Sequence, residues 1–267
     1  ASRKTIARIV DAIDGLPLAI ELAAARVRML GVDQIADRLR DTLRLLAGRN
    51  ATLPNRQQTL RATVEWSWNL LQPWEQSALL QCAVFRSGFS VDAAEVVVDL
   101  SEHPDAPWTL DVLQELIDQN LLQVVSHPDL PDETRVRMYQ TVHAYAKERL
   151  QQSEAIDTVT QRHASWAVHR GEALLADCET ASDARPMLRL DLERDNLYGA
   201  FENTQESDPD TAADAMLVIS AVLRRNGPIS NVINSLQTVL ENTSGARRLR
   251  LLVQLAKAQG IAGANED

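Results

Sequence analysis

Cysteine, aromatic residues and long hydrophobic runs are all scarce in this chain of 267 residues. Its two cysteines, Cys82 and Cys178, lie far apart and outside any CxxC spacing, which excludes a disulfide framework, a zinc ribbon and a thioredoxin-type site. Aromatic residues make up 4% of the chain, which favours helices packed through Leu, Val and Ala. Neither an 18-residue apolar run nor a signal-peptide pattern occurs, so we expect no membrane span, no export and a cytoplasmic protein.

The short motifs that carry chemistry are missing as well. No GxxxxGK[ST] loop is present to bind phosphates, and GxGxxG, GxSxG, HExxH and EF-hand patterns are absent. Five histidines occur, but none has the i, i+4 spacing that would place two metal ligands on one helix face. We therefore expect no catalytic residue, no metal site and no enzymatic activity in this chain.

The length of 267 residues predicts two or three compact units. The chain begins without Met and stops with IAGANED, just after an apolar helical stretch. From these two features we expect a piece of a longer protein.

Charge is distributed unevenly along the chain, whose net charge is −10. Residues 1–60 carry ten Lys and Arg against six Asp and Glu, a net charge of +4. Residues 61–150 carry six against fourteen, a net charge of −8, and residues 151–267 carry the remaining −6. The change of sign near residue 60 indicates a domain boundary, and the acidic middle segment should repel phosphate.

Helical periodicity dominates the first segment. Gly15 interrupts one helix together with Asp14, and Pro17 suits the first turn of the next, where its missing N–H costs nothing. The segment GRNATLP, residues 48–54, reads as a loop. Two apolar faces are predicted, one through Leu18, Leu22, Ala25 and Met29 and one through Ile35, Leu39, Leu43 and Leu46.

The order of elements from residue 60 to 150 is that of a winged helix. Three helical stretches are followed by a fourth, which begins at a Thr109 cap and ends at Asn120. The second stretch opens at Pro73 and the third is capped by Ser90. Two β-prone runs, LLQVVS and RVRMYQTV, then flank the polar turn HPDLPDE and predict a hairpin.

Beyond residue 155 the pattern consists of amphipathic helices, separated by polar breaks at residues 207–210 and 226–228. Such a succession indicates paired helices stacked as a solenoid. The predicted fold class is therefore mainly α, with a helical subdomain, a winged helix containing a small β hairpin, and solenoid-like helical repeats. The predicted boundaries are residues 1–58, 59–153 and 154–267.

Winged-helix domains often bind DNA. Whether this one is expected to do so depends on the charge of its recognition helix. The expected recognition helix, residues 109–120, contains Asp111, Glu115 and Asp118 and no Lys or Arg. Duplex DNA is densely negative, and recognition proteins usually meet it with several cations. This argument predicts that the winged helix does not bind DNA directly and serves as a packing module.

Several motifs, in the same order, resemble one family. The segment DGLPLAIELAAARVRML, residues 14–30, resembles the GLPL motif of the signal-transduction ATPases with numerous domains, the NB-ARC group, which includes bacterial transcriptional regulators. The resemblance continues through RQQTLRATVEWSWNLL, FRSGFSVDAAE and YQTVHAYAKERL to LDLERDNLYGAF at residues 190–201. It covers about the first 200 residues.

The resemblance implies a switch operated by ADP or ATP. An upstream P-loop domain, absent from this sequence, would bind the nucleotide, and Gly15, Leu16 and Pro17 would lie at its adenine edge. A Met-His-Asp motif often senses the diphosphate in this family, but the matching positions here are Met138, Tyr139 and Gln140, so Tyr139 is the candidate contact. The helical repeats would receive a protein partner or a small-molecule inducer.

Two functions follow from these observations. The first is a non-catalytic regulatory and interaction segment that closes over a nucleotide-binding domain. The alternative is a winged-helix DNA-binding transcription factor. Strong, salt-sensitive binding of DNA would favour the alternative.

Overall fold

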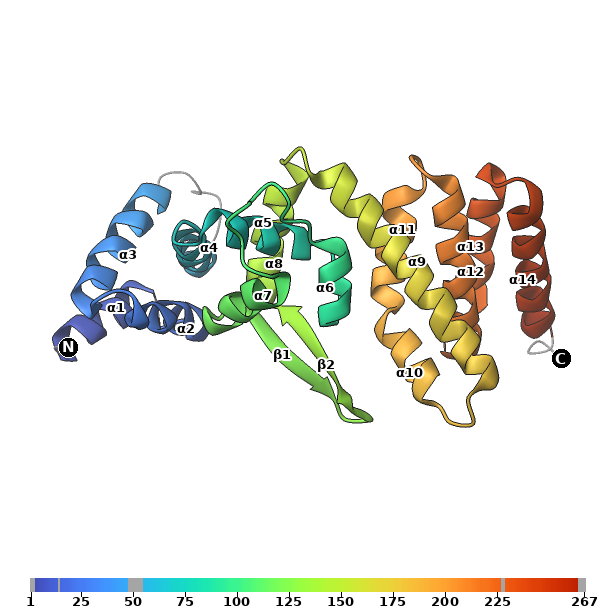
Figure 1. Ribbon diagram of the computed structural model, residues 1–267, viewed down its shortest axis with the longest axis horizontal. Coiled ribbons are helices and arrows are strands. Elements are labelled where there is room, and N and C mark those ends of the chain that lie inside the picture. Colours follow the sequence, from blue (N-terminus) through green and yellow to red (C-terminus); the bar gives the residue numbers. More distant parts are fainter. Residues whose placement is uncertain (1–2, 14, 48–54, 227–228, 264–267) are drawn as a thin grey trace. The chain divides into compact units, whose positions relative to one another are not determined.

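The computed structural model describes most of the chain and shows helices together with one hairpin of two strands (Figure 1). This arrangement confirms the predicted mainly α fold class with a winged helix. The ranges described are residues 3–13, 15–47, 55–226 and 229–263.

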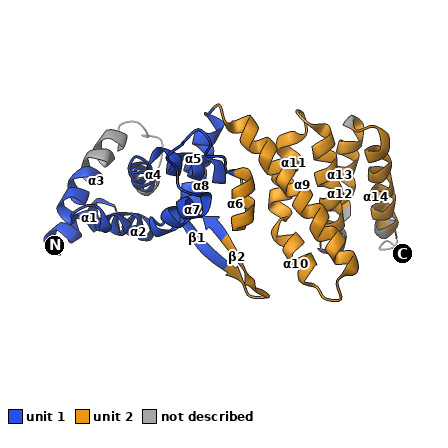
Figure 2. Cartoon of the chain, in the orientation of Figure 1, with its two compact units in different colours: residues 1–83, 98–125, 136–153 blue, residues 84–97, 126–135, 154–267 orange. Residues whose placement is uncertain are grey.

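Internal contacts divide the chain into two compact units, which are coloured separately in Figure 2. Unit 1 comprises residues 1–83, 98–125 and 136–153. Unit 2 comprises residues 84–97, 126–135 and 154–267. This division follows packing within the chain, and the domain boundaries expected at residues 58 and 153 stay a prediction.

Unit 1 begins with a small packet of helices. These are α1 (Arg3–Ala12), α2 (Pro17–Ala25), the 3₁₀ helix η1 (Arg26–Arg28), α3 (Val32–Ala47) and α4 (Asn55–Trp68). Helix α3 packs against α1 and α4, and α2 packs against α4. The shared core is aliphatic apart from one tryptophan, and it consists of Ile9, Ile13, Ala19, Ala23, Ile35, Ala36, Leu39 and Trp66.

The turn before α2 forms as predicted, but the helix is shorter than expected. Gly15 has a left-handed φ of 62°, and Pro17 occupies the first turn of α2. Helix α2 then ends at Ala25, and the tighter η1 turn rotates the following side chains, so Met29 is 72% exposed. The predicted apolar face through Met29 is therefore wrong, and Leu30 packs on the core instead.

Some predictions for this region fall on atoms that the structure does not describe. These are Asp14, the side chains of Leu43 and Leu46, and the loop at residues 48–54.

The winged helix follows with α5, α6, α7, the hairpin β1–β2 and α8, in the predicted order. The bounds are α5 (Pro73–Cys82), α6 (Val91–Val97), α7 (Thr109–Asp118), β1 (Leu122–His127), β2 (Leu130–Met138) and α8 (Gln140–Gln151). Within unit 1, α5 packs against α7 and α8. Helix α6 and the distal part of the hairpin belong to unit 2, where α6 packs against α9 (Ile156–Thr180).

Local sequence explains where these helices begin and end. Pro73 occupies the first turn of α5, and the Ser90 hydroxyl accepts a hydrogen bond from the backbone N–H of Ala93 at 3.2 Å. Asn120 has the left-handed φ of 57° expected past the end of α7. The expected Thr109 cap is wrong, because Trp108 precedes α7 as its N-cap without a side-chain bond.

The hairpin is longer than predicted. Only Pro128 and Asp129 form its turn, and β2 already begins at Leu130 within the segment expected to be the connection. Pro131 lies in a two-stranded sheet, which has only edge strands, the positions where proline is tolerated in sheets.

The remaining helices of unit 2 form the predicted helical array (Figure 1). After α9 come α10 (Arg185–Leu192), α11 (Arg194–Thr204), α12 (Pro209–Asn226), α13 (Ile229–Asn242) and α14 (Gly245–Gly263). Each of α11, α12 and α13 packs against the next helix in the chain, as in a solenoid. Their core is rich in Ala, Val and Leu, which lets helix axes approach closely.

Candidate nucleic-acid interface

Helix α7 has one buried face and one exposed face. Val112, Leu113 and Leu116 are buried in the core, at the spacing of a single helical stripe. The exposed side chains are those of Leu110, Asp111, Gln114, Glu115 and Asp118. In a helix-turn-helix domain the second helix of the motif presents such a face to the major groove.

The acidity of α7 is partly compensated by a residue far away in sequence. Arg28 of η1 lies 3.1 Å from Asp118, measured from Nη1 to Oδ2, and its side chain is 77% exposed. Gln114 donates a hydrogen bond from Nε2 to the other carboxylate oxygen of Asp118 at 2.9 Å. Sequence reasoning missed Arg28, because nothing in the sequence pairs η1 with α7.

Glu115 on the same face of α7 has a raised pKa. Burial raises its pKa, and the nearby Glu75 raises it further. Glu75 is itself buried and accepts hydrogen bonds from the Gln72 backbone N–H at 2.6 Å and from Gln119 Nε2 at 2.7 Å. The bond from Gln119 fixes the end of α7 against α5. This contact helps to fix the orientation of the exposed face of α7.

The end of α7 is also tied to the first helices of unit 1. The side-chain amide of Asn120 donates to the backbone oxygen of Glu21 on α2 at 3.2 Å. The GLPL-containing helix therefore lies beside the end of α7.

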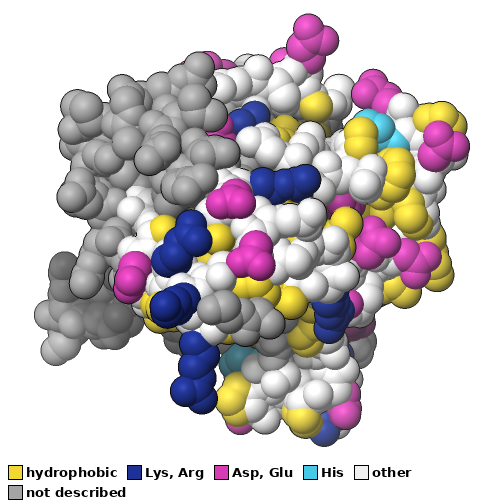
Figure 3. Space-filling view, turned by 90° about the vertical axis from the view of Figure 1, so that its left-hand side faces the viewer, with side chains coloured by type: hydrophobic (Ala, Val, Ile, Leu, Met, Phe, Trp, Pro, Cys, Tyr) yellow, Lys and Arg dark blue, Asp and Glu magenta, His cyan; other side chains and the backbone are white. Residues whose placement is uncertain are grey.

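Unit 1 carries a further exposed cation on the hairpin. Arg137 on β2 is exposed, in the part of the strand that belongs to unit 1. Among the coloured residues in Figure 3, Lys and Arg side chains lie among Asp, Glu and hydrophobic side chains.

The predicted nucleotide residues occupy two places in unit 1. Gly15 and Pro17 are exposed, and Leu16 is half-buried on the edge of the aliphatic core. Tyr139 precedes α8 as its N-cap, and its pKa is raised by burial and then by Glu21 of α2. The structure thus brings Tyr139 near α2, while no contact between Tyr139 and Gly15, Leu16 or Pro17 is among those described.

An apolar groove lies close to the same turn. Its volume is about 280 Å³. Helices α1, α2, η1 and the start of α3 supply only Ile, Val and Ala side chains to its lining, which is formed by Ile6, Ile9, Val10, Ile13, Ile20, Ala23, Ala24, Val27, Val32 and Ile35.

Metal-ligating side chains do not cluster in the described part of the chain, and one of the two thiols is buried. Within residues 3–13, 15–47, 55–226 and 229–263, no three His, Cys, Asp or Glu side chains gather to hold a metal ion. Cys82 is fully buried, which raises the pKa of its thiol to about 12. None of the helices described is both long and apolar enough to cross a bilayer.

Comparison with known proteins supports the winged helix. Residues 71–151 match the family model of a winged helix-turn-helix domain. Over 211 residues the chain is 39% identical to proteins from Mycobacterium bovis and Mycobacterium tuberculosis that are named "Putative HTH-type transcriptional regulator". Each match covers 78% of this chain and 23% of the relative, so the chain spans less than a quarter of the length of these relatives.

A further relative, an uncharacterized protein from Mycobacterium bovis, is 37% identical over 159 residues, which are 60% of this chain and 40% of that protein. No solved structure is significantly similar to the chain. The resemblance to the nucleotide-switched NB-ARC group finds no support in these matches.

These findings correct the prediction that the winged helix does not bind DNA directly. A winged helix-turn-helix domain and relatives named as HTH-type regulators point to DNA binding. The prediction failed because it considered only the net charge of the middle segment and the charge of one helix. Phosphate contacts come from several elements of such a domain. At base edges, Gln can donate and accept hydrogen bonds, and Asp and Glu can accept them from the cytosine amino group.

Proposed function

We propose that this chain is part of a transcriptional regulator and that its winged helix binds duplex DNA through the exposed face of α7. The observation that carries the proposal is the match of residues 71–151 to a winged helix-turn-helix domain. The exposed polar face of α7 agrees with it, because Val112, Leu113 and Leu116 anchor the opposite face.

The side chains on α7 suit base recognition better than phosphate binding. Gln114 can bond in bidentate fashion to adenine, and Asp111 and Glu115 can accept hydrogen bonds from the cytosine amino group. Phosphate contacts would come from Arg28 and Arg137, both exposed. Two phosphate contacts predict a slope of about −2 for the logarithm of the association constant against the logarithm of salt concentration.

Selection of duplexes from a random pool, followed by gel-shift titration of the 267-residue chain, tests this proposal. We expect a preferred sequence, and we expect Gln114→Ala to weaken its binding by roughly five- to 150-fold, since a bidentate base contact discriminates by roughly 1–3 kcal/mol. Gln237→Ala, at an exposed position of α13, is the matched control and should bind like the wild type.

Two results would overturn DNA recognition by α7. The selection could yield no enriched duplex, or the Gln114 and Gln237 variants could bind the selected duplex equally well.

In a second function, a switch operated by ADP or ATP, the turn before α2 would lie against the nucleotide. The backbone N–H groups of Gly15 and Leu16 already donate to Val10 and Ile13 at 2.9 and 3.0 Å, and Pro17 has no N–H. These residues could therefore pack against an adenine ring but offer no donor to a phosphate. In this function the segment would close over a nucleotide that an upstream P-loop domain holds. The segment itself would contribute no catalytic residue.

The groove of about 280 Å³ beside this turn suits such packing, since its lining is wholly apolar. In this second function the helical repeats would receive a protein partner or a small-molecule inducer. Calorimetric titration of ADP into the chain should give at best a millimolar dissociation constant. A micromolar constant would contradict the need for the upstream domain.

A further inference from the structure

Helix α14 of unit 2 has one face that is packed in the core of the helical array (Figure 1). Leu251, Leu255 and Ala258 are buried on this face, and α14 packs against α12 and α13. The three residues are spaced by four and three positions and therefore form a single stripe. A helix that ends a solenoid carries a polar outer face on its other side, because that face meets water.

The other face of α14 is apolar instead. Leu249, Leu252, Val253 and Ala256 are spaced by three, one and three positions, which places them together on one side of the helix. We call these four residues the outer stripe. Leu249 is 65% exposed, Leu252 43% and Val253 46%, and Ala256 is exposed as well. Contiguous exposed apolar side chains of this kind mark an interaction surface.

Helix α12 shows where a helix with two apolar faces lies in this array. It packs against α9, α11, α13 and α14, and none of its residues from 211 to 223 is exposed. A helix that is apolar all round is an interior helix. The two stripes of α14 therefore have the pattern of an interior helix of the array and not of its polar end.

A glycine continues the outer stripe. Gly260 lies four residues after Ala256, and a methyl group added to it would meet no described atom within 4 Å. At Gly171 of α9, inside the array, an added methyl group would lie 2.9 Å from Val218 and 3.1 Å from Leu197. Gly171 thus allows the close approach of neighbouring helices, and Gly260 leaves room for a similar approach to α14.

Cations flank the outer stripe. Arg250 and Lys257 lie three residues before and four residues after Val253, and both are exposed. Helix α14 contains four Arg and Lys residues and no Asp or Glu. These charges favour an occupant with acidic side chains. They oppose a second copy of this chain, because two α14 helices face to face would bring like charges together.

We propose that the outer stripe receives one more helix of the array, an amphipathic helix of the longer protein with acidic residues beside its apolar stripe. From the proposed function this inference takes only that the chain is part of a longer regulator, and it does not depend on DNA binding. The chain spans 23% of the length of its relatives, so proteins of this kind are long enough to supply such a helix. Because α14 begins at Gly245, soon after α13 ends at Asn242, short connections are the rule here, and the added helix should run antiparallel to α14.

The test joins a designed helix directly after residue 267 and follows amide hydrogen exchange in residues 245–263 by mass spectrometry. The designed helix has the 19-residue length of α14, a stripe of leucines and glutamates on both flanks. We expect exchange in α14 to slow by about tenfold. This is the factor for a site with a dissociation constant of about 0.1 mM and a tethered helix at an effective concentration of about 1 mM.

Matched variants separate the apolar contribution from the charged one. The same designed helix with lysine flanks should protect α14 less, and Arg250→Glu/Lys257→Glu should reverse that order. Leu252→Asp should remove the protection and, since Leu252 is outside the core, leave unit 2 folded. Val124→Asp, at a position of β1 that is 55% exposed, is the control and should keep the protection.

Several results would overturn the proposal. Neither designed helix could slow exchange, or the glutamate and lysine helices could protect α14 equally. Protection by the glutamate helix as a separate peptide, but not when joined to the chain, would assign the outer stripe to a partner protein. A dimer in sedimentation that Leu252→Asp dissociates would assign it to a second copy. The gel-shift titration tests DNA binding separately, so the failure of one proposal is distinguishable from the failure of the other.

Discussion

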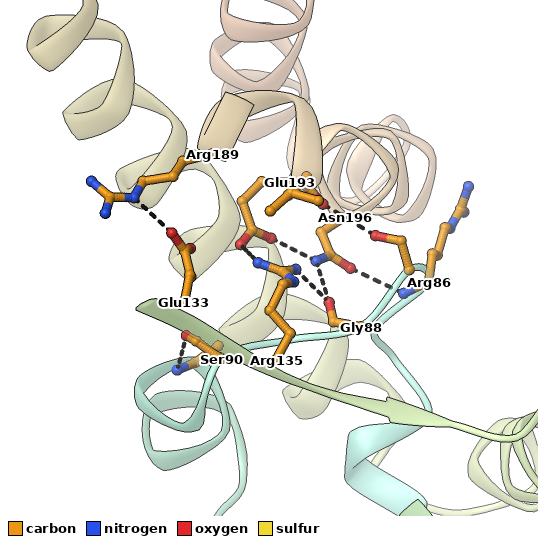
Figure 4. A network of polar contacts seen from close by, with 11 residues as sticks. Arg86, Gly88, Ser90, Glu133, Arg135, Arg189, Glu193 and Asn196 are labelled. Atoms are coloured by element: carbon orange, nitrogen blue, oxygen red, sulfur yellow. Dashed lines mark hydrogen bonds and ion pairs between the residues drawn. The ribbon is translucent and has the colours of Figure 1, made fainter. Parts of the chain in front are cut away.

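Arg135 and Glu193 are separated by 58 positions in the sequence, yet they form an ion pair from which solvent is nearly excluded (Figure 4). Removing one partner of such a pair leaves an uncompensated buried charge, which costs about 3–5 kcal/mol. We therefore expect Glu193→Ala to lower the free energy of unfolding of unit 2 by about that amount, as measured by urea denaturation.

The double variant Arg135→Met/Glu193→Leu removes both charges and keeps apolar volume. It should be more stable than Glu193→Ala, since replacement of a buried pair by hydrophobic residues is often neutral. A double variant less stable than the single one would mean that the pair contributes a net stabilisation of its own.

Gly88 is required by its backbone conformation. Its φ is 111°, and its carbonyl oxygen accepts hydrogen bonds from both Arg135 and Asn196. We expect Gly88→Ala to lower the free energy of unfolding by about 1–3 kcal/mol, because an alanine strains at this φ. The control is Gly31→Ala, where φ is ordinary and the nearest atom to an added methyl group is 3.8 Å away. Equal stability of the two variants would refute this explanation.

Asn120 combines a left-handed φ of 57° with a hydrogen bond to Glu21. Both Asn120→Gly and Asn120→Ala lose the bond, but only alanine strains at this φ. The glycine variant should thus be more stable than the alanine variant by about 1 kcal/mol in chemical denaturation. At Asn69, where φ is not positive, the alanine variant should instead be more stable than the glycine variant. The same order at both positions would argue against the backbone explanation.

His163 gives unit 2 a pH dependence. The residue is fully buried against Phe85 and Trp166, and burial lowers its pKa to about 4 from 6.5. Nearby Arg86 lowers the pKa further, and Asn196 opposes both effects. The folded state therefore holds the neutral ring, and the unfolded state takes up a proton first as the pH falls.

Stability should fall by roughly 3 kcal/mol between about pH 6.5 and pH 4 and be nearly constant above this range. His163→Phe should flatten the profile of unfolding free energy against pH, whereas His169→Phe, at an exposed position of α9, should leave it unchanged. An unaltered slope in the His163 variant would show that other groups control the pH dependence.

Local sequence was sufficient for features that depend on neighbouring residues. Pro17 and Pro73 begin helices, Ser90 caps one, and Gly15 and Asn120 adopt left-handed φ, because backbone sterics and short-range hydrogen bonds decide these conformations. The order of four helical stretches and a hairpin likewise predicted the winged helix that the family model matches at residues 71–151.

Sequence reasoning failed where a property depended on distant residues. The acidity of α7 predicted repulsion of DNA, but Arg28 from η1 pairs with Asp118 across 90 positions of sequence. Arg135 lies in a β-prone run. The alternation of polar and apolar residues in that run did not indicate that Arg135 would form a buried ion pair with Glu193.

The amino-acid sequence by itself determined the fold class, the element order and the local helix starts of this protein, since these follow from periodicity and from contacts within a few residues. The tertiary structure alone decided which charges meet, and therefore which arginines are exposed and which are buried. The physical reason is that an ion pair or a buried polar network requires groups to lie within about 4 Å, and only the folded chain brings residues so far apart in sequence that close.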